Sequence, residues 1–231
     1  FSLWKFIWSK NKKMKRFEKK YTFLPNLHNL IYCQLLSLGF EEVYEKRIVN
    51  SIYYDDERFS LYQDSIDGLG NRNKYRLRFY NYQVKKLKIE NKIRSNEYGL
   101  KEFINIDDDL INVEIYNIFL DQKLLVKIPK NIKNSYKPIL ITNYERTYLA
   151  LPEDKYSRVT LDKQIKFGKV DYWMNDSLRS NINIPFERNI MEIKSSSKNE
   201  FFSGRIIQSF DQLYLQNERS SKYCNAVDSL F

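Results

Sequence analysis

Charged and apolar residues alternate along several segments of the chain, a pattern typical of β-strands whose two faces have different surroundings. The segment 74–79 is the clearest example, with basic residues on one face and apolar residues on the other: Lys74, Arg76 and Arg78 against Tyr75, Leu77 and Phe79. A half-buried strand ordinarily leaves its charged face in water. Three cations in a row can also line a site for a polyanion, so this strand alone leaves both interpretations open.

The same alternation predicts strands at residues 14–23, 85–95, 157–167 and 188–195, and further strands are predicted at 44–54, from its strong β propensity, and at 138–149. Their charged faces are rich in Lys and Arg with an occasional acidic residue: Arg16, Glu18 and Lys20; Lys86, Lys88, Glu90, Lys92 and Arg94; Arg158, Thr160 and Asp162; Glu192 and Lys194. Strand 85–95 follows strand 74–80 after a short polar connection, so an antiparallel hairpin is the simplest link.

Helical spacing of apolar residues predicts a helix that begins at Pro25 and runs to Leu38, where Gly39 is a natural stop. A last short helix is predicted to begin at Ser221. We find no internal repeat, Pro-rich linker or low-complexity block, which predicts one domain over residues 14–231. Residues 1–13 are interpreted as an N-terminal extension that is non-native or unstructured.

Residues 97–136 mix apolar and acidic positions, and we predict that they are mainly helical. The run Asp107-Asp108-Asp109 lies in this segment. Such a run resembles a metal site, but solvated caps at a helix start are the commoner occurrence. We therefore assign no metal to it.

Two architectures explain strands with one charged and one apolar face. A flat sheet with helices on one side would leave the charged face in water. An α+β fold with a closed antiparallel β-barrel would instead place the charges inside and the apolar faces outside, under helices, and closure would remove the sheet edges. A cationic interior would repel itself unless glutamates and a bound polyanion neutralised it.

Composition narrows the partners and excludes several kinds of catalytic site. The 231 residues carry a net charge of +10, which favours anionic partners such as nucleotides, polyphosphate, nucleic acid or acidic lipid. The only cysteines, Cys33 and Cys224, and the single histidine, His28, argue against a zinc site or a Ser-His-Asp triad. Reduced cysteines and the lack of a run of roughly 20 apolar residues predict a cytoplasmic chain with no membrane span of its own.

Seven short motifs in this order resemble the VTC domain of the triphosphate tunnel metalloenzymes, a superfamily that also includes CYTH proteins. They are Arg16-x-Glu18-x-Lys20-Tyr21, Lys74-x-Arg76-x-Arg78, Glu90-x-Lys92, Tyr144-x-Arg146, Arg158-x-Thr160-x-Asp162, Glu192-x-Lys194 and Ser221-Lys222-Tyr223. The resemblance implies a barrel-shaped tunnel and a polyphosphate polymerase, which transfers the γ-phosphate of ATP to a growing phosphate chain and needs Mn²⁺ or Mg²⁺.

The resemblance also implies roles for individual residues. The catalytic set is Lys20, Arg76, Arg78 and Glu192, in which Arg76 and Arg78 grip the triphosphate. Further phosphate-binding residues are Lys74, Lys88, Lys92, Tyr144, Arg146, Arg158, Lys194, Ser221 and Lys222, of which Lys88 is included only from its place in the strand alternation. Metal ligands are Glu192 first, then Glu18 and Glu90.

One departure from the wider superfamily affects the expected activity. Hydrolytic CYTH members begin with Glu-x-Glu-x-Lys, whereas this chain has Arg16 at the first position. A cation there weakens a second metal or water-activating site, which favours a polymerase or a polyphosphate-binding protein over a triphosphatase.

Alternative functions remain at this stage. They are a non-catalytic polyphosphate sensor, a tunnel-type triphosphatase and, ranked lowest, an RNA-binding module. The expected partners are ATP and inorganic polyphosphate, with no nucleic acid. Association with a membrane partner is left open.

Overall fold

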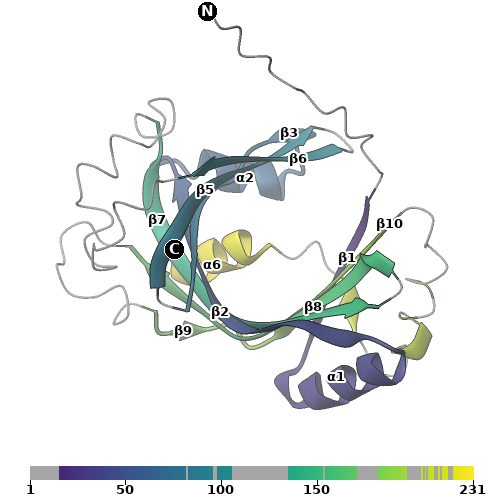
Figure 1. Cartoon of the computed structure of the whole chain (residues 1–231). Coiled ribbons are helices and arrows are strands. Elements are labelled where there is room, and N and C mark those ends of the chain that lie inside the picture. The colour runs from purple at the N-terminus through teal and green to yellow at the C-terminus, as the bar shows by residue number, and fades with distance from the viewer. Residues whose placement is uncertain are drawn as a thin grey trace, which may run out of the picture.

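The computed structural model describes residues 16–81, 83–95, 98–105, 135–152, 154–170, 182–196 and 221–231, together with 204, 206, 208–210, 213 and 215–217. Its principal strands form one strongly curled antiparallel sheet (Figure 1). The strands are β1 (Arg16–Phe23), β2 (Glu41–Asp55), β3 (Asn71–Arg72), β4 (Tyr75–Tyr80), β5 (Gln83–Ser95), β6 (Tyr98–Asn105), β7 (Lys137–Leu151), β8 (Asp154–Lys169), β9 (Ile184–Pro185), β10 (Asn189–Ser196) and β11 (Gln216–Asn217).

The sheet is an open, curled half-barrel. Its order is β11-β1-β10-β8-β7-β2-β4-β5-β3, and β6 pairs with the other side of β5. Strand β1, with the two-residue β11 beside part of it, and strand β6 therefore lie at opposite ends of the sheet, and no pairing between β1 and β6 is found in the residues that the structure describes. The expected closure into a barrel by strand pairing is thus not seen. Side chains approach across the gap, where Lys92 Nζ on β5 lies 3.9 Å from Glu18 Oε1 on β1.

The convex face of the sheet carries one apolar core under helix α1 (His28–Ser37). The helix follows a short 3-10 turn, η1 (Pro25–Leu27), which confirms the helical segment predicted to begin at Pro25. Ile31 and Leu35 of α1 are fully buried against the odd-numbered, apolar residues of β1, β8 and β10, such as Tyr21, Leu161 and Met191. Alternation in the strands therefore sends these apolar side chains outward, as predicted.

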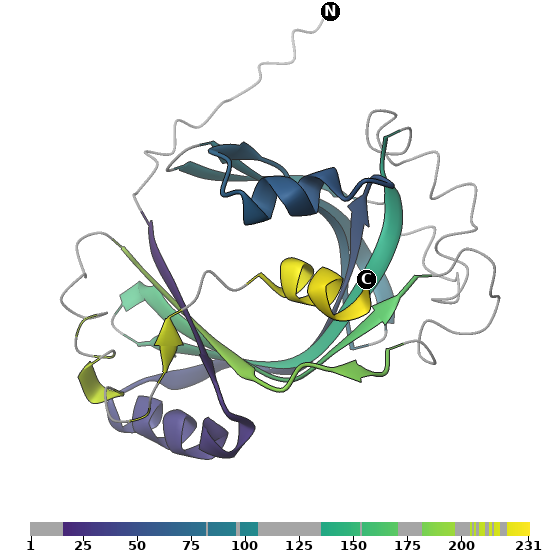
Figure 2. The same ribbon diagram turned by 180° about the vertical axis from the view of Figure 1, so that it is seen from behind.

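Helix α6 (Lys222–Leu230) lies on the concave side of the sheet, so the expectation that the helices cover only the outside is wrong (Figure 2). Its buried face packs against a second apolar core that includes Val49, Tyr53 and Tyr144. The rings of Tyr53 and Tyr223 stack at 5.1 Å. The predicted start at Ser221 is confirmed, since its Oγ accepts a hydrogen bond from the N–H of Cys224, as an N-cap residue does.

The prediction of helix at residues 97–136 is wrong for its first part. Residues 98–105 form β6, which pairs along its whole length with β5. The reason is visible in the alternation of Tyr98, Leu100 and Ile104 with Gly99, Lys101 and Asn105, a period of two that the predicted helix overlooked and that Glu102 and Phe103 interrupt. The rest of the segment, including Asp107-Asp108-Asp109, and the N-terminal extension 1–13 lie outside the described residues.

A fully buried carboxylate, Asp55, ties α6 and helix α2 (Ser60–Ile66) to the end of β2. It accepts hydrogen bonds from the backbone N–H groups of Leu61 and Tyr62, both at 3.0 Å, and from the hydroxyl of Tyr223. Tyr62 in turn donates to Asp228 of α6 at 2.5 Å. Asp55 therefore determines how α6 is held against one end of the curled sheet.

We expect Asp55→Ala to lower the free energy of unfolding by about 3 kcal/mol, because buried N–H donors at Leu61 and Tyr62 lose their acceptor. Urea unfolding followed by circular dichroism measures the effect. Glu57→Ala is the matched control, since the Glu57 side chain is 83% exposed and should leave the midpoint unchanged. Equal midpoints for both variants would contradict the anchoring role of Asp55.

Candidate functional site

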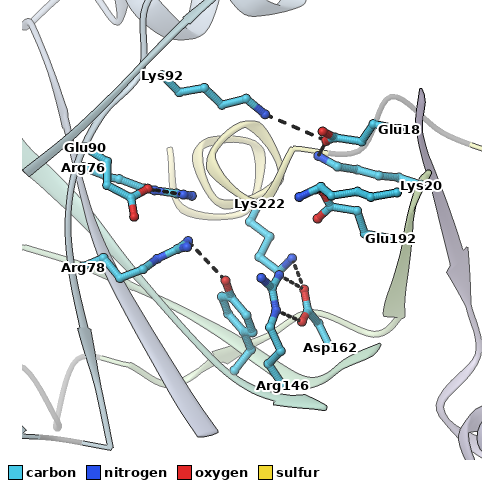
Figure 3. A network of polar contacts seen from close by, with 12 residues as sticks. Glu18, Lys20, Arg76, Arg78, Glu90, Lys92, Arg146, Asp162, Glu192 and Lys222 are labelled. Carbon is cyan, nitrogen blue, oxygen red and sulfur yellow. Dashed lines mark hydrogen bonds and ion pairs between the residues drawn. The ribbon is translucent and has the colours of Figure 1, made fainter. Parts of the chain in front are cut away.

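Charged side chains from six strands and from α6 point into the space enclosed by the curled sheet (Figure 3). This set, the concave cluster, comprises Glu18 and Lys20 of β1, Arg76 and Arg78 of β4, Glu90 and Lys92 of β5, Arg146 of β7, Asp162 of β8, Glu192 of β10 and Lys222 of α6. These residues are far apart in the sequence, and strand alternation places them on one face.

One wall of the concave cluster is formed by the two arginines of β4. Arg76 donates to Glu90 through Nε at 2.7 Å and also through Nη2. Burial alone would raise the pKa of Glu90, but the charge of Arg76 outweighs it and lowers the pKa, so Glu90 stays ionised. Arg78, only 9% exposed, donates to the hydroxyls of Ser51 at 3.1 Å and Tyr144 at 3.4 Å. Its hydrogen bonds therefore leave its charge available to an anion.

The floor of the concave cluster is a buried ion triad. Asp162, which has no exposed surface, accepts two hydrogen bonds from Arg146, at 2.5 and 2.7 Å, and one from Lys222 at 2.5 Å. Both cations also lie over the ring of Tyr144, Arg146 at 5.2 Å and Lys222 at 4.5 Å from its centre. Burial would raise the pKa of Asp162, but Arg146 outweighs it and lowers the pKa. The triad thus fastens α6 to the sheet.

The opposite wall carries two neighbouring carboxylates among lysines. Glu192 lies 2.7 Å from Lys194, and Glu18 lies 3.8 Å from Lys20. Strand register places Glu18 opposite Lys194 and Lys20 opposite Glu192. Burial would raise the pKa of Glu192, but the charges of Lys194 and Lys20 hold it well below its ordinary value. Glu192 is therefore a buried, ionised carboxylate facing the arginine wall (Figure 3).

The predicted metal ligands divide between the two walls. Glu18 and Glu192 lie together, whereas Glu90 faces them from β5 and is held by Arg76. Magnesium is commonly held by one or two carboxylates together with substrate phosphates. The hydroxyl of Thr160, opposite Glu192 in the β8–β10 register, is buried without a hydrogen-bond partner in the described structure. The Glu18–Glu192 pair thus suits a cation shared with a phosphate oxygen.

Lys74 and Ser221, both predicted to bind phosphate, contact each other at the α6 end of the enclosed space. Lys74 Nζ donates to Ser221 Oγ at 2.9 Å and lies 3.8 Å from Cys224 Sγ. Burial lowers the pKa of Lys74. This end of the space is therefore occupied by α6 and its N-cap.

The remaining residues predicted to bind phosphate, Lys92, Arg158 and Lys88, differ from one another in their surroundings. Burial lowers the pKa of Lys92, although the nearby Glu18 acts in the opposite direction. Arg158 lies opposite Lys194 in the strand register, but its side chain is exposed. The backbone of Lys88 pairs with Arg78, and its side chain lies outside the described structure.

Sequence reasoning missed Lys101 because its strand was predicted to be helical. Lys101 of β6 pairs directly with Lys92 and retains solvent exposure at the sheet edge. Partial desolvation, followed by repulsion from Arg76, lowers the pKa of Lys101 to about 8. The alternation of residues 98–105 was the signal that could have revealed it.

Comparison of the structure with solved structures defines the fold class first. A candidate adenylate cyclase from Vibrio parahaemolyticus aligns with a TM-score of 0.52 and 16% identity over 93% of this chain and 98% of that chain. A candidate adenylyl cyclase from Hippeastrum, described as having a dominant triphosphatase activity, aligns with a TM-score of 0.52 and 12% identity over 93% of this chain and 96% of that chain. These likenesses show that the chain has the tunnel fold.

The sequence then gives the family. A family model described as the VTC domain matches residues 10–231, so the chain belongs to the VTC domain family. Subunit 2 of the vacuolar transporter chaperone complex of Saccharomyces cerevisiae is 28% identical over 155 residues, or 54% of this chain. The match covers 19% of that protein's length.

We expect the affinity of the protein for inorganic tripolyphosphate to fall as the pH rises through about 8, because Lys101 loses its charge there. The sign follows from the lowered pKa: below pH 8 the ammonium adds to the cationic field, and above it the field weakens. Isothermal titration calorimetry from pH 6.5 to 9.5 measures the change. Lys101→Met should flatten this part of the profile, and an unchanged profile in this variant would contradict the assignment.

Proposed function

We propose that this chain is an ATP–polyphosphate phosphotransferase, a polyphosphate polymerase that transfers the γ-phosphate of ATP to a growing inorganic polyphosphate chain. The observation that carries the proposal is the convergence of Arg76 and Arg78 on one wall with Glu192 on the other, inside a space lined by cations. Membership of the VTC domain family supports it. A bound phosphate chain would also span the gap between β1 and β6 and complete the tunnel.

The proposed reaction needs positioning and charge stabilisation more than it needs a base. A terminal oxygen of the acceptor chain attacks the γ-phosphorus of ATP, a new P–O bond forms, and the bond to the β–γ bridging oxygen breaks to release ADP. The acceptor oxygen is already anionic, so no proton has to be removed. Arg78 and Arg76 stabilise the charge of the transferred group, while Lys20 and Lys194 hold the adjoining phosphates.

A divalent cation, Mn²⁺ or Mg²⁺, would supply charge neutralisation between phosphate oxygens. Glu192 is the residue we assign to hold it, with Glu18 beside it, while Glu90 lies on the opposite wall and is paired with Arg76 (Figure 3). The low pKa of Glu192 keeps its oxygens free of protons at neutral pH. A hard carboxylate ligand is then available at neutral pH, where the lysines are charged.

The second candidate function is a polyphosphate-binding sensor. It is favoured by the small number of acidic ligands: in the described ranges, no group of three or more His, Cys, Asp or Glu residues is arranged to hold a metal.

Hydrolysis of a triphosphate is the third candidate. The side chain of Arg16, which argued against it, lies outside the described structure.

The location of the protein in the cell is part of the same proposal. Within the described ranges, no helix is long and apolar enough to cross a membrane. We retain a cytoplasmic location and an association with a membrane partner as predictions. Both can be checked by fractionating cells that express a tagged full-length protein.

Incubation of the protein with ATP and Mn²⁺ or Mg²⁺ should produce chains that an exopolyphosphatase digests. Arg78→Ala should reduce synthesis by about 100-fold or more, because charge stabilisation of the transferred phosphoryl group is lost. Lys163→Ala is the matched control, since Lys163 pairs with Glu145 outside the concave cluster. ATP that remains intact with either metal would refute the polymerase, and phosphate release without chain growth would identify a triphosphatase.

Glu192→Gln separates the enzyme from the sensor. In a polymerase, synthesis should fall by about 100-fold, since the metal ligand is lost, while binding of polyphosphate is retained or strengthened by the removal of a negative charge. Chain synthesis and polyphosphate binding are measured on the same preparation. Wild-type protein that binds polyphosphate but makes none, with either metal, would support the sensor.

A further inference from the structure

We propose that an aromatic collar at the end of the enclosed space opposite α6 binds the base of a nucleoside triphosphate. The collar is defined as Tyr44, Arg47, Tyr80 and Tyr148. The inference rests on the proposed function, because it assigns one part of the ATP molecule to a place beside the phosphate-binding residues. No residue of the collar belongs to the seven sequence motifs.

The collar is held together by ring contacts. The guanidinium of Arg47 lies over the ring of Tyr44 at 5.5 Å and over that of Tyr80 at 5.9 Å. Tyr44 meets Tyr148 edge to face at 5.7 Å. The chain of contacts continues to Arg146, which lies 5.9 Å from the ring centre of Tyr148. Aromatic faces and guanidinium planes are the groups on which nucleobases stack.

Two local irregularities bring the collar residues together. The pairing of β2 with β7 shifts register between Glu42 and Tyr44 and again between Tyr44 and Arg47. Such bulges redirect side chains, and here they allow Tyr44 and Arg47, three positions apart, to meet. At the other side, Asn81 adopts a left-handed conformation with φ 50° and exchanges two hydrogen bonds of 2.9 Å with the backbone of Ile48. This holds Tyr80 beside β2.

Exposure distinguishes the collar from the aromatic residues at the α6 end. Tyr44 is 59% and Tyr80 37% exposed, whereas Tyr53 and Tyr223, which stack under α6, are 6% and 2% exposed. The collar thus presents aromatic surface to solvent at the mouth of a cationic space. A stacked base would cover that surface.

The spacing along the strands fits a nucleotide. Tyr148 lies two residues after Arg146 in β7, and Tyr80 lies two residues after Arg78 in β4. Each of these two tyrosines therefore lies about 7 Å beyond a phosphate-binding arginine on the same face. In a nucleoside triphosphate, a ribose separates the base from the phosphates. A base on the collar therefore leaves the triphosphate among Arg78 and Arg146, with its γ-phosphate directed inward.

The chemistry of the collar also predicts how selective it is. Stacking recognises the face of a base, and every base has one. We therefore expect a clear preference for nucleoside triphosphates over inorganic tripolyphosphate, with little discrimination between ATP and GTP.

The test compares ATP with inorganic tripolyphosphate as ligands of the full chain, by isothermal titration calorimetry without turnover at low temperature. Tyr44→Ala should weaken ATP binding about tenfold, or about 1.4 kcal/mol, and leave tripolyphosphate binding unchanged. Tyr44→Phe, which keeps the ring, should restore ATP binding. Tyr80→Ala provides a second variant on another strand, and Tyr32→Ala on the convex helix α1 is the matched control.

The outcomes distinguish this inference from the proposed function. Wild-type protein that binds tripolyphosphate and ATP equally, with Tyr44→Ala indistinguishable from it, would overturn the collar as a base site and leave the phosphate tunnel intact. A collar that instead contacts a partner protein would give the same result. Failure of the wild type to bind either ligand would overturn both proposals. Loss of both ligands in Tyr44→Ala alone, with a normal unfolding midpoint, would also overturn a base-specific role.

Discussion

The structure depends on how carboxylates offset the repulsion between cations that face one another across a narrow space. Lysines and arginines from five strands and from α6 would repel one another strongly in a region of low dielectric constant. Buried carboxylates offset part of that repulsion: Glu90 at Arg76, Asp162 at Arg146 and Glu192 at Lys194. The compensation is incomplete, since cations remain in excess. The concave cluster thus retains a net positive charge, which attracts polyanions.

Much of the fold and most of the concave cluster could be predicted from the sequence, because strand alternation is a local property. Arg76, Arg78 and Glu192 each lie in a segment with period two, so their common face could be predicted for each strand separately. The apolar face of β4, with Leu77 and Phe79, was predicted for the same reason, and both side chains are buried. Alternation does not reveal how far a sheet curls. The prediction of a closed barrel therefore included a pairing of edge strands that the described structure does not show.

The features that the sequence did not reveal depend on tertiary contacts. The position of α6 inside the curl follows from Asp55 and Asp162, two buried carboxylates that bind groups more than 50 residues away along the chain. Tyr44 and Arg47 violate strict alternation, and only the bulges of β2 bring them to one side. Lys101 was missed because the surrounding segment, rich in isoleucine and acidic residues, favoured helix over strand.

The seam between β1 and β6 has a consequence for how a long polymer enters. In the described structure, side chains rather than backbone span it, with Lys92 and Glu18 42% and 36% exposed. An exposed ion pair of this kind contributes at most about 1 kcal/mol, whereas opening a backbone ladder would break several hydrogen bonds together. If the chain acts on polyphosphate as proposed, a chain of phosphates would be laid into the groove sideways, at any point along its length, without its end being threaded first.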